Sequence, residues 1–203
     1  MRKSVFYNFL RFIKNFILQR KEYLPGFKKQ FLTFGKNSTI YYPSNIPDKK
    51  FIKIGNNTTI LQNSRMQVFN YLTGLKANIA IGDNCYIGFS LTLLAGANIN
   101  IGNDVLIASN VLVASENHGI DPESNTPYMN QPLACKEVFI EDGCWIGENA
   151  SILSGVHIGK KCIVATNAVV TKNIPDYSMV AGIPAKIIKK YNFETHKWDK
   201  ATV

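Results

Sequence analysis

One histidine of the chain occupies a position where a proton-accepting side chain could take part in catalysis. His118 lies in residues 115–121, SENHGID, and Pro122, Pro127 and Pro132 follow it. A neutral imidazole accepts a proton near neutral pH, because its unperturbed pKa is about 6.5. It can therefore act as a general base toward an attacking hydroxyl group. A lone histidine is more often structural than catalytic, so the case for His118 depends on the elements that surround it.

Trp145 is the second unusual residue. Its position, counted from the aliphatic Ile140, predicts that its side chain points away from the interior. An outward tryptophan is unfavourable unless something covers it, and two covers remain open, a neighbouring subunit or a bound ligand. His157 is also expected to face outward, and we interpret it as a surface residue.

These residues lie within a repeat of six residues. A helix needs apolar residues every three or four positions, and a half-buried strand needs them at every second position. A period of six is typical of a solenoid in which three short strands close a triangular coil of about 18 residues. We therefore predict an all-β solenoid over residues 31–184, whose interior is filled by the repeated aliphatic side chains. The runs are Phe34, Ile40, Ile46 and Ile52; Ile54, Ile60, Met66 and Leu72; Ile81, Ile87, Leu93 and Ile99; Ile101, Ile107 and Val113; and Ile140, Ile146, Ile152, Ile158, Val164 and Val170.

Small residues accompany the repeat at the fourth position after each aliphatic, as at Thr58 and Ala150, and we expect them to fit near the corners. Cys144 and Cys162 are 18 residues apart, so they are predicted to stack in neighbouring coils as interior fillers. No disulfide framework is expected, and no CxxC pair indicates a zinc site. We predict no bound metal.

The repeat is interrupted between Val113 and Ile140, which are 27 residues apart. A solenoid can extrude a loop from a corner without losing its core, and loops of this length are usually functional. The sequence predicts one long extruded loop over about residues 114–137, with His118 near its start.

The two ends of the chain differ from the repeat. Residues 1–30 contain eight basic residues against Glu22 alone, and their apolar residues share one face at helical spacing. This predicts a basic amphipathic helical segment that caps the solenoid, lies on an anionic membrane surface, or does both. Residues 185–203 are expected to form a C-terminal tail.

The same composition limits the partners and the location. The rest of the chain is close to neutral and does not interleave basic residues with aromatic ones, so no nucleic-acid partner is expected. No apolar stretch is long enough to span a membrane, and Arg11 and Lys14 interrupt any signal-peptide core. We expect a cytoplasmic protein, with peripheral contact at the inner face of the membrane through residues 1–30.

The repeat resembles that of the hexapeptide-repeat acyltransferases, over about residues 34–190. The similarity is most specific in IEDGCWIGENASILSGVHIGKKCIVATNAVVTKNIPDYSMVAGIPAKIIKK, and the nearest branch is that of the maltose and galactoside O-acetyltransferases and their polysaccharide-modifying relatives. The resemblance implies a left-handed parallel β-helix, a homotrimer whose sites lie between subunits, and acetyl-CoA as cosubstrate.

The resemblance also implies roles for individual residues. His118 matches the family's general base. Ser90 and Asn117 match acceptor-binding positions, although the sugar acetyltransferases commonly have asparagine where this chain has Ser90. Glu116, Asp121 or a backbone carbonyl could orient His118. The resemblance implies that Trp145 lies beside the pantetheine arm of acetyl-CoA and that Lys186 and Lys189 face its phosphates. The other implied cofactor contacts, expected along one ridge, are Gly147, Ala165, Thr166, Thr171 and Lys172.

These features favour an acetyl-CoA-dependent O-acetyltransferase that acts on a sugar or on a unit of a surface polysaccharide. N-acetylation of an amino-sugar nucleotide, or of a drug such as a streptogramin or chloramphenicol, is the alternative enzyme. A γ-class carbonic anhydrase needs three zinc-binding histidines. The sequence does not favour that enzyme, because His196 lies beyond the solenoid. A purely structural β-helix would need neither the long loop nor the outward tryptophan.

Overall fold

The computed structural model describes residues 26–201, and none of the helices described there is long and apolar enough to cross a membrane. The amphipathic helix expected over residues 1–30 lies outside the described residues, except for residues 26–30. That short stretch contains the 3-10 helix η1 (Lys28–Gln30).

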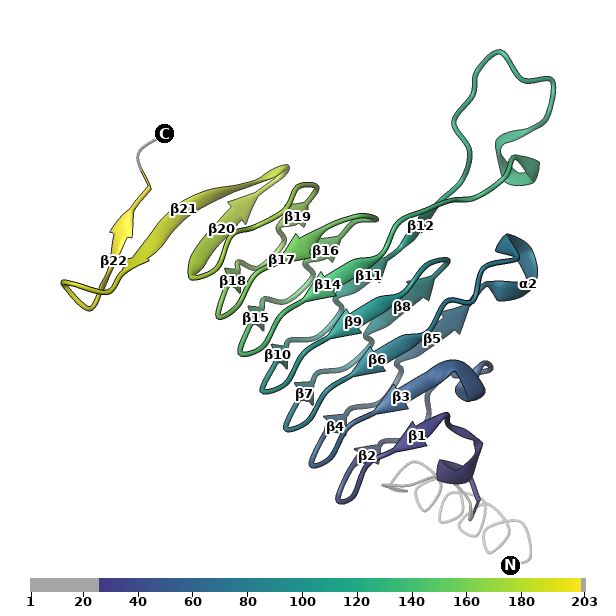
Figure 1. Cartoon of the computed structure of the whole chain (residues 1–203), viewed down its shortest axis with the longest axis horizontal. Coiled ribbons are helices and arrows are strands. Elements are labelled where there is room, and N and C mark those ends of the chain that lie inside the picture. Colours follow the sequence, from purple (N-terminus) through teal and green to yellow (C-terminus); the bar gives the residue numbers. More distant parts are fainter. Residues whose placement is uncertain (1–25, 202–203) are drawn as a thin grey trace, which may run out of the picture.

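The described chain winds into a three-sided prism, and each side is a sheet of strands from successive coils (Figure 1). We name the sides sheet A, sheet B and sheet C. Sheet A contains, in order, β1 (Thr33–Phe34), β3 (Ile52–Ile54), β6 (Ile79–Ile81), β9 (Ile99–Ile101), β14 (Val138–Ile140) and β17 (His157–Ile158). Sheet B contains β2 (Thr39–Ile40), β4 (Thr59–Ile60), β7 (Tyr86–Ile87), β10 (Leu106–Ile107), β15 (Trp145–Ile146), β18 (Ile163–Val164), β20 (Ser178–Gly182), β21 (Ala185–Asn192) and β22 (Lys197–Lys200). Sheet C contains β5 (Arg65–Val68), β8 (Thr92–Ala95), β11 (Leu112–Ala114), β16 (Ser151–Ile152) and β19 (Val169–Val170).

The period of six determines how the coils pair. In sheet B, Ile60 lies opposite Ile87, and the same parallel register continues through Ile107, Ile146 and Val164. All five side chains are fully buried. The fold is therefore the parallel β-helix that the sequence predicts, with one continuous core inside the prism.

Leu72 does not belong to this core, and its assignment to the second aliphatic run was wrong. Its side chain is 59% exposed in the short helix α2 (Asn70–Thr73). The chain leaves the coil after Val68 and resumes the repeat at Ile79. The solenoid therefore has a second, smaller insertion on the corner between sheets C and A.

The corner between sheets A and B shows why small residues recur there. Their side-chain hydroxyls and thiols donate hydrogen bonds to a backbone carbonyl of the next coil, as Thr58 does to Gly82 at 2.8 Å. Cys144 and Cys162 bond in the same way to Gly159 and to Pro175. The predicted stacking of these two cysteines as buried fillers is confirmed.

Side-chain oxygens of Asn and Asp link the same corner from coil to coil on its outer side. The carboxylate of Asp83 accepts a 2.7 Å hydrogen bond from the backbone N–H of Asn56. The N–H of Asp83 in turn donates to the side chain of Asn103, at 2.8 Å. Either residue type can therefore fill this position, because both present an acceptor oxygen at the same place.

The segment expected to be a C-terminal tail contains β21 and β22, which extend sheet B with antiparallel pairing. Tyr191 of β21 lies opposite Trp198 of β22, and their rings contact edge to face. Tyr177 and Phe193 join this aromatic cluster. Residues 185–200 are therefore an ordered hairpin at the end of the prism.

We predict that Asp83→Ala lowers the free energy of unfolding by about 1 kcal/mol, because the N–H of Asn56 loses its acceptor. Asp83→Asn should retain most of the stability, since Asn103 fills the equivalent place in the next coil. Urea titration of the two variants measures the difference. Equal stability of Asp83→Ala and the unsubstituted protein would show that the side-chain ladder does not hold the corner together.

Candidate active site

The extruded loop leaves the corner between sheets C and A, after β11, and the chain returns to the prism at β14 (Figure 1). Its two arms pair as an antiparallel ribbon, with β12 (Glu116–Asn117) against β13 (Ala134–Cys135). The 3-10 helix η3 (Tyr128–Asn130) lies in the outer part. The predicted loop is confirmed, and His118 directly follows the paired stem.

The base of the stem is anchored to the prism. Ser115 is fully buried, and its hydroxyl donates to the carbonyl of Ala97 at 2.7 Å. A Cβ on Gly96 would lie 2.7 Å from Cβ of Glu116, so the stem packs directly against a corner that only glycine permits. His118 is therefore three residues beyond a buried anchor.

The outer part of the loop is organised by one buried side chain. Gln131 is 7% exposed, and its amide oxygen accepts a hydrogen bond from the N–H of Asp121. Its amide nitrogen donates to the carbonyls of Asp121 and Thr126. These contacts close the loop on itself.

His118 and Asn117 are both exposed at the end of the stem. Within the described part of the chain, no hydrogen bond to the imidazole of His118 is present. Of the expected orienting residues, Asp121 instead accepts a hydrogen bond from the N–H of Glu123, at 2.9 Å. Neither Asp121 nor Glu116 orients His118 in this protomer.

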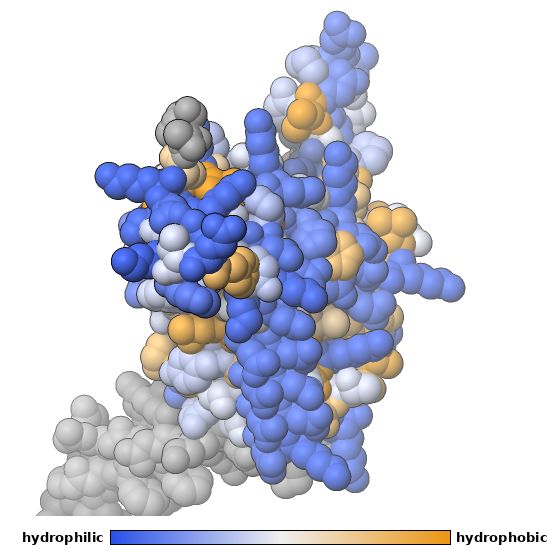
Figure 2. Space-filling model, turned by 60° about the vertical axis from the view of Figure 1, so that its left-hand side comes forward, coloured by the Kyte–Doolittle hydropathy of each residue, from blue (hydrophilic) through white to orange (hydrophobic). Residues whose placement is uncertain are grey.

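Trp145 begins β15 and points outward from sheet B, where its side chain is 50% exposed. It belongs to a row of outward residues in register from coil to coil. The middle of this row is apolar, and its C-terminal end carries two lysines. The row runs Tyr86, Leu106, Trp145, Ile163, Met179, Lys189 and Lys200. The face shown in Figure 2 is mostly hydrophilic, with apolar residues in separate patches.

The corner between sheets B and C lies beside this row and contains Gly147, Ala165 and Thr166. A Cβ on Gly147 would lie 2.6 Å from the backbone nitrogen of Thr166, so the position accepts no side chain without a backbone shift. Ser90 lies on the same corner in an earlier coil, with a positive φ of 58°. Ser90 is therefore not on the corner that carries Asn117 and His118.

Thr171 and Lys172 follow β19, so they lie on the corner between sheets C and A. The expectation that these two residues share one ridge with Gly147, Ala165 and Thr166 was wrong, because sheet C separates the two groups. Lys186 and Lys189 lie in β21 at the C-terminal end of sheet B.

The positions of His118 and Trp145 have a direct consequence. The corner that extrudes the loop joins sheets C and A, whereas Trp145 is on the outer face of sheet B, which is the opposite side of the triangle. A fully packed core lies between them. Within one protomer the two side chains therefore lie on opposite sides of the prism.

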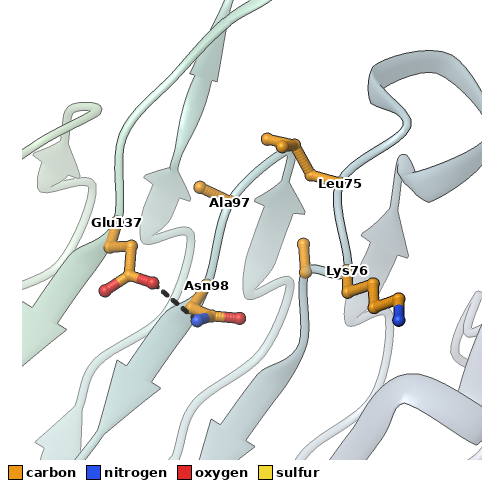
Figure 3. Close-up of a pocket in the computed structure, with 6 residues that line it drawn as sticks. Leu75, Lys76, Ala97, Asn98 and Glu137 are labelled. Atoms are coloured by element: carbon orange, nitrogen blue, oxygen red, sulfur yellow. Dashed lines mark hydrogen bonds between the residues drawn. The ribbon is translucent and has the colours of Figure 1, made fainter.

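A groove on the loop-bearing corner was not predicted from the sequence. It has a volume of about 190 Å³ and is lined by Leu75, Lys76, Ala77, Ala97, Asn98 and Glu137 (Figure 3). The available signal was the spacing of 13 residues between the buried Met66 and Ile79, but Leu72 falls six residues after Met66 and hid the insertion.

Among the described residues, no group of three or more His, Cys, Asp or Glu side chains is placed to hold a metal ion. His157, interpreted as a surface residue, is exposed, and its Nε2 lies 2.9 Å from Oε1 of Glu141.

The family comparisons agree with this architecture. A model of the family described as "Bacterial transferase hexapeptide (six repeats)" matches residues 137–172. The chain is 34% identical over 200 residues to the "Putative lipopolysaccharide biosynthesis O-acetyl transferase WbbJ" of Escherichia coli (strain K12), a match that covers 95% of this chain and 93% of the relative. The chain belongs to the hexapeptide-repeat acetyltransferases. Its β-helix is the left-handed form that the resemblance implies.

Two further relatives belong to the same family of enzymes. The galactoside O-acetyltransferase of Escherichia coli (strain K12) is 34% identical over 116 residues, covering 57% of this chain and 56% of the relative. The solved hexapeptide-repeat acetyltransferase VCA0836 of Vibrio cholerae, complexed with acetyl coenzyme A, is 28% identical and superposes with a TM-score of 0.56. That superposition covers 81% of this chain and 74% of the relative.

We predict that Gln131→Ala opens the outer part of the loop without destabilising the prism, because only contacts within the loop are lost. The loss of three hydrogen bonds of about 1 kcal/mol each should speed amide exchange in residues 119–131 by at least about tenfold. Gln131→Glu keeps one acceptor but sets a carboxylate oxygen against the carbonyls of Asp121 and Thr126, so it should speed exchange at least as much. Hydrogen exchange followed by mass spectrometry measures both, and unchanged rates in Gln131→Ala would show that other contacts hold the loop.

Proposed function

We propose that the protein transfers an acetyl group from acetyl-CoA to a hydroxyl group of a sugar, most specifically a sugar unit of a surface polysaccharide. The observation that carries this proposal is the exposed His118 on an anchored stem in a hexapeptide-repeat acetyltransferase. Support comes from the O-acetyltransferase names of the relatives and from the acetyl coenzyme A in the solved relative. The alternative, N-acetylation of an amine, uses the same donor. The two activities are distinguished by whether a hydroxyl or an amine acceptor reacts.

The proposed chemistry requires one proton acceptor. The imidazole of His118 removes the proton of the sugar hydroxyl while the oxygen attacks the thioester carbonyl. A C–O bond forms as the C–S bond breaks, and the imidazolium returns the proton to the departing thiolate. Backbone N–H groups of a rigid coil stabilise the negative charge that develops on the carbonyl oxygen. Because a thioester is already activated, the reaction needs neither a covalent enzyme intermediate nor a metal.

The outward row of sheet B fits the chemistry of the donor. Trp145, Ile163 and Met179 offer an apolar track for the pantetheine arm, and Lys189 offers a charge for the phosphates. Three rungs separate Trp145 from Lys189, which is about 14 Å at ~4.8 Å per rung. Gly147 lets the chain pack closely against the backbone of Ala165 and Thr166, and Lys186 adds a second positive charge beside Lys189. We propose Thr166 as a further contact to acetyl-CoA.

We also propose that the protein is a homotrimer with its sites between protomers. The loop-bearing corner of one protomer, with His118, Asn117, Thr171 and Lys172, then lies toward the sheet B face of the next. This arrangement resolves the separation of His118 and Trp145 on opposite sides of one prism. It also covers the exposed apolar row, which a lone protomer would leave in water.

The role that we propose for residues 1–30 rests on their sequence alone. A basic amphipathic segment suits the cytoplasmic face of a membrane, where glycans are assembled on lipid carriers. We therefore place the enzyme in the cytoplasm, with peripheral contact through residues 1–30.

We predict that His118→Ala lowers kcat for acetyl transfer by about 10²–10⁴-fold, the contribution of a positioned general base. His157→Ala is the matched control, since it removes an exposed imidazole from sheet A, outside the loop, and should leave kcat within about twofold. Release of the coenzyme A thiol against a panel of sugars, amino sugars and drug acceptors measures kcat. Equal activity of the two variants would contradict the role of His118.

A mixture of His118→Ala and Trp145→Ala protomers tests whether the site is shared. In randomly mixed trimers, about one quarter of the sites would combine an intact His118 with an intact Trp145 from a neighbour. Activity at low acetyl-CoA concentration should then exceed the mean of the two separate variants. An activity equal to that mean would place both residues in the same chain's site.

A further inference from the structure

We propose that the groove on the loop-bearing corner is a second sugar subsite, which binds a saccharide unit next to the one that is acetylated. This inference rests on the proposed function, because it specifies that the acceptor is an oligosaccharide or polymer rather than a free monosaccharide. We name this feature the corner groove, with Leu75, Ala97, Asn98 and Glu137 as its defining residues (Figure 3).

The corner groove exists because two insertions leave the same edge of the prism. The insertion containing α2 forms one wall, and the returning arm of the catalytic loop forms the other. Between them the corner residue Ala97 is small and buried, so the two walls rise above it. An uninterrupted coil would have no walls at this edge and therefore no groove.

The wall formed by the α2 insertion is held in place by specific contacts. The side chain of Asn70 spans the insertion, accepting from the N–H of Ala77 at 2.8 Å and donating to its carbonyl at 3.1 Å. Gly74 ends the helix with a positive φ of 68°. The insertion therefore presents Leu75, which is 48% exposed, from a fixed backbone.

The lining of the corner groove suits a sugar ring. Leu75, Ala77 and Ala97 give an apolar surface for ring C–H groups. On the other side, Asn98 donates from Nδ2 to Oε1 of Glu137 at 2.6 Å (Figure 3). That bond orients the carboxylate and leaves Oε2 without a hydrogen-bond partner among the described residues, so it can accept from a sugar hydroxyl.

The location relates the corner groove to the catalytic loop. The N–H of Lys136, next to Glu137, bonds to the carbonyl of Ser115, three residues before His118. At about 3.3 Å per residue, His118 and Glu137 lie about 10–13 Å apart along the stem. A disaccharide can span this distance, so one sugar can occupy the corner groove while its neighbour reaches the imidazole.

Matched saccharides of different length test the inference. Binding of glucose, maltose and maltotriose, and of galactose and lactose, is measured by saturation-transfer NMR, and acetylation is measured by release of the coenzyme A thiol. We expect at least one oligosaccharide to bind about tenfold more tightly than its monosaccharide. Glu137→Gln and Leu75→Ala should each remove that advantage while leaving monosaccharide binding unchanged.

Glu141→Gln is the matched control. It also removes a carboxylate that bonds to a neighbouring coil, through His157, but it lies on the corner between sheets A and B. It should leave the preference for length intact. Sedimentation of each variant verifies that the oligomeric state has not changed, since a change would assign Glu137 or Leu75 to a subunit contact and overturn the proposal.

The outcomes separate this inference from the proposed function. Binding that depends on length but is followed by no acetylation would support the corner groove and refute the O-acetyltransferase activity on these sugars. Acetylation that does not depend on saccharide length would support the O-acetyltransferase activity and refute the second subsite. Failure of every saccharide to bind, or a length preference that survives Glu137→Gln, would overturn the second subsite.

Discussion

Parallel pairing of each coil with the next, in register and without offset, is the constraint on which the other features depend. It places Ile60, Ile87, Ile107, Ile146 and Val164 in one buried row, and it stacks the corners above one another. A segment that leaves one corner therefore remains at that edge of the prism. For this reason a rigid core holds the loop with His118 and the face with Trp145 apart, whichever side chains occupy the surface.

The sequence predicts the interior well because interior positions depend on the period alone. Cys144 and Cys162, 18 residues apart, were correctly placed in neighbouring coils, since one full turn separates them. Leu72 was misplaced because it keeps the spacing although the chain has left the coil. Spacing counts residues along the chain, and it cannot tell whether a residue with the correct spacing belongs to a strand or to an insertion. Packing in three dimensions makes that distinction.

The candidate site was only partly predictable, for a related reason. Gly147 and Ala165 are 18 residues apart and share a corner, whereas Ala165 and Thr171 are six apart and must lie on successive corners. That arithmetic was available from the sequence. The antiparallel stem, the buried Ser115 and the internal bonds of Gln131 were not, because none of them follows the repeat. They depend on contacts between residues that no period relates.

In the proposed site, a general base on the loop and a donor along one prism face would place opposite mechanical demands on different elements. An extended thioester needs a straight, regular track, which stacked strands provide with one outward residue per rung. An acceptor of variable structure needs walls that differ between enzymes, and insertions at a corner supply them without disturbing the core. The insertion containing α2 and the catalytic loop share a corner, so both can act on one acceptor. The opposite face of the prism, where we propose that the donor binds, keeps its regular stacking of strands.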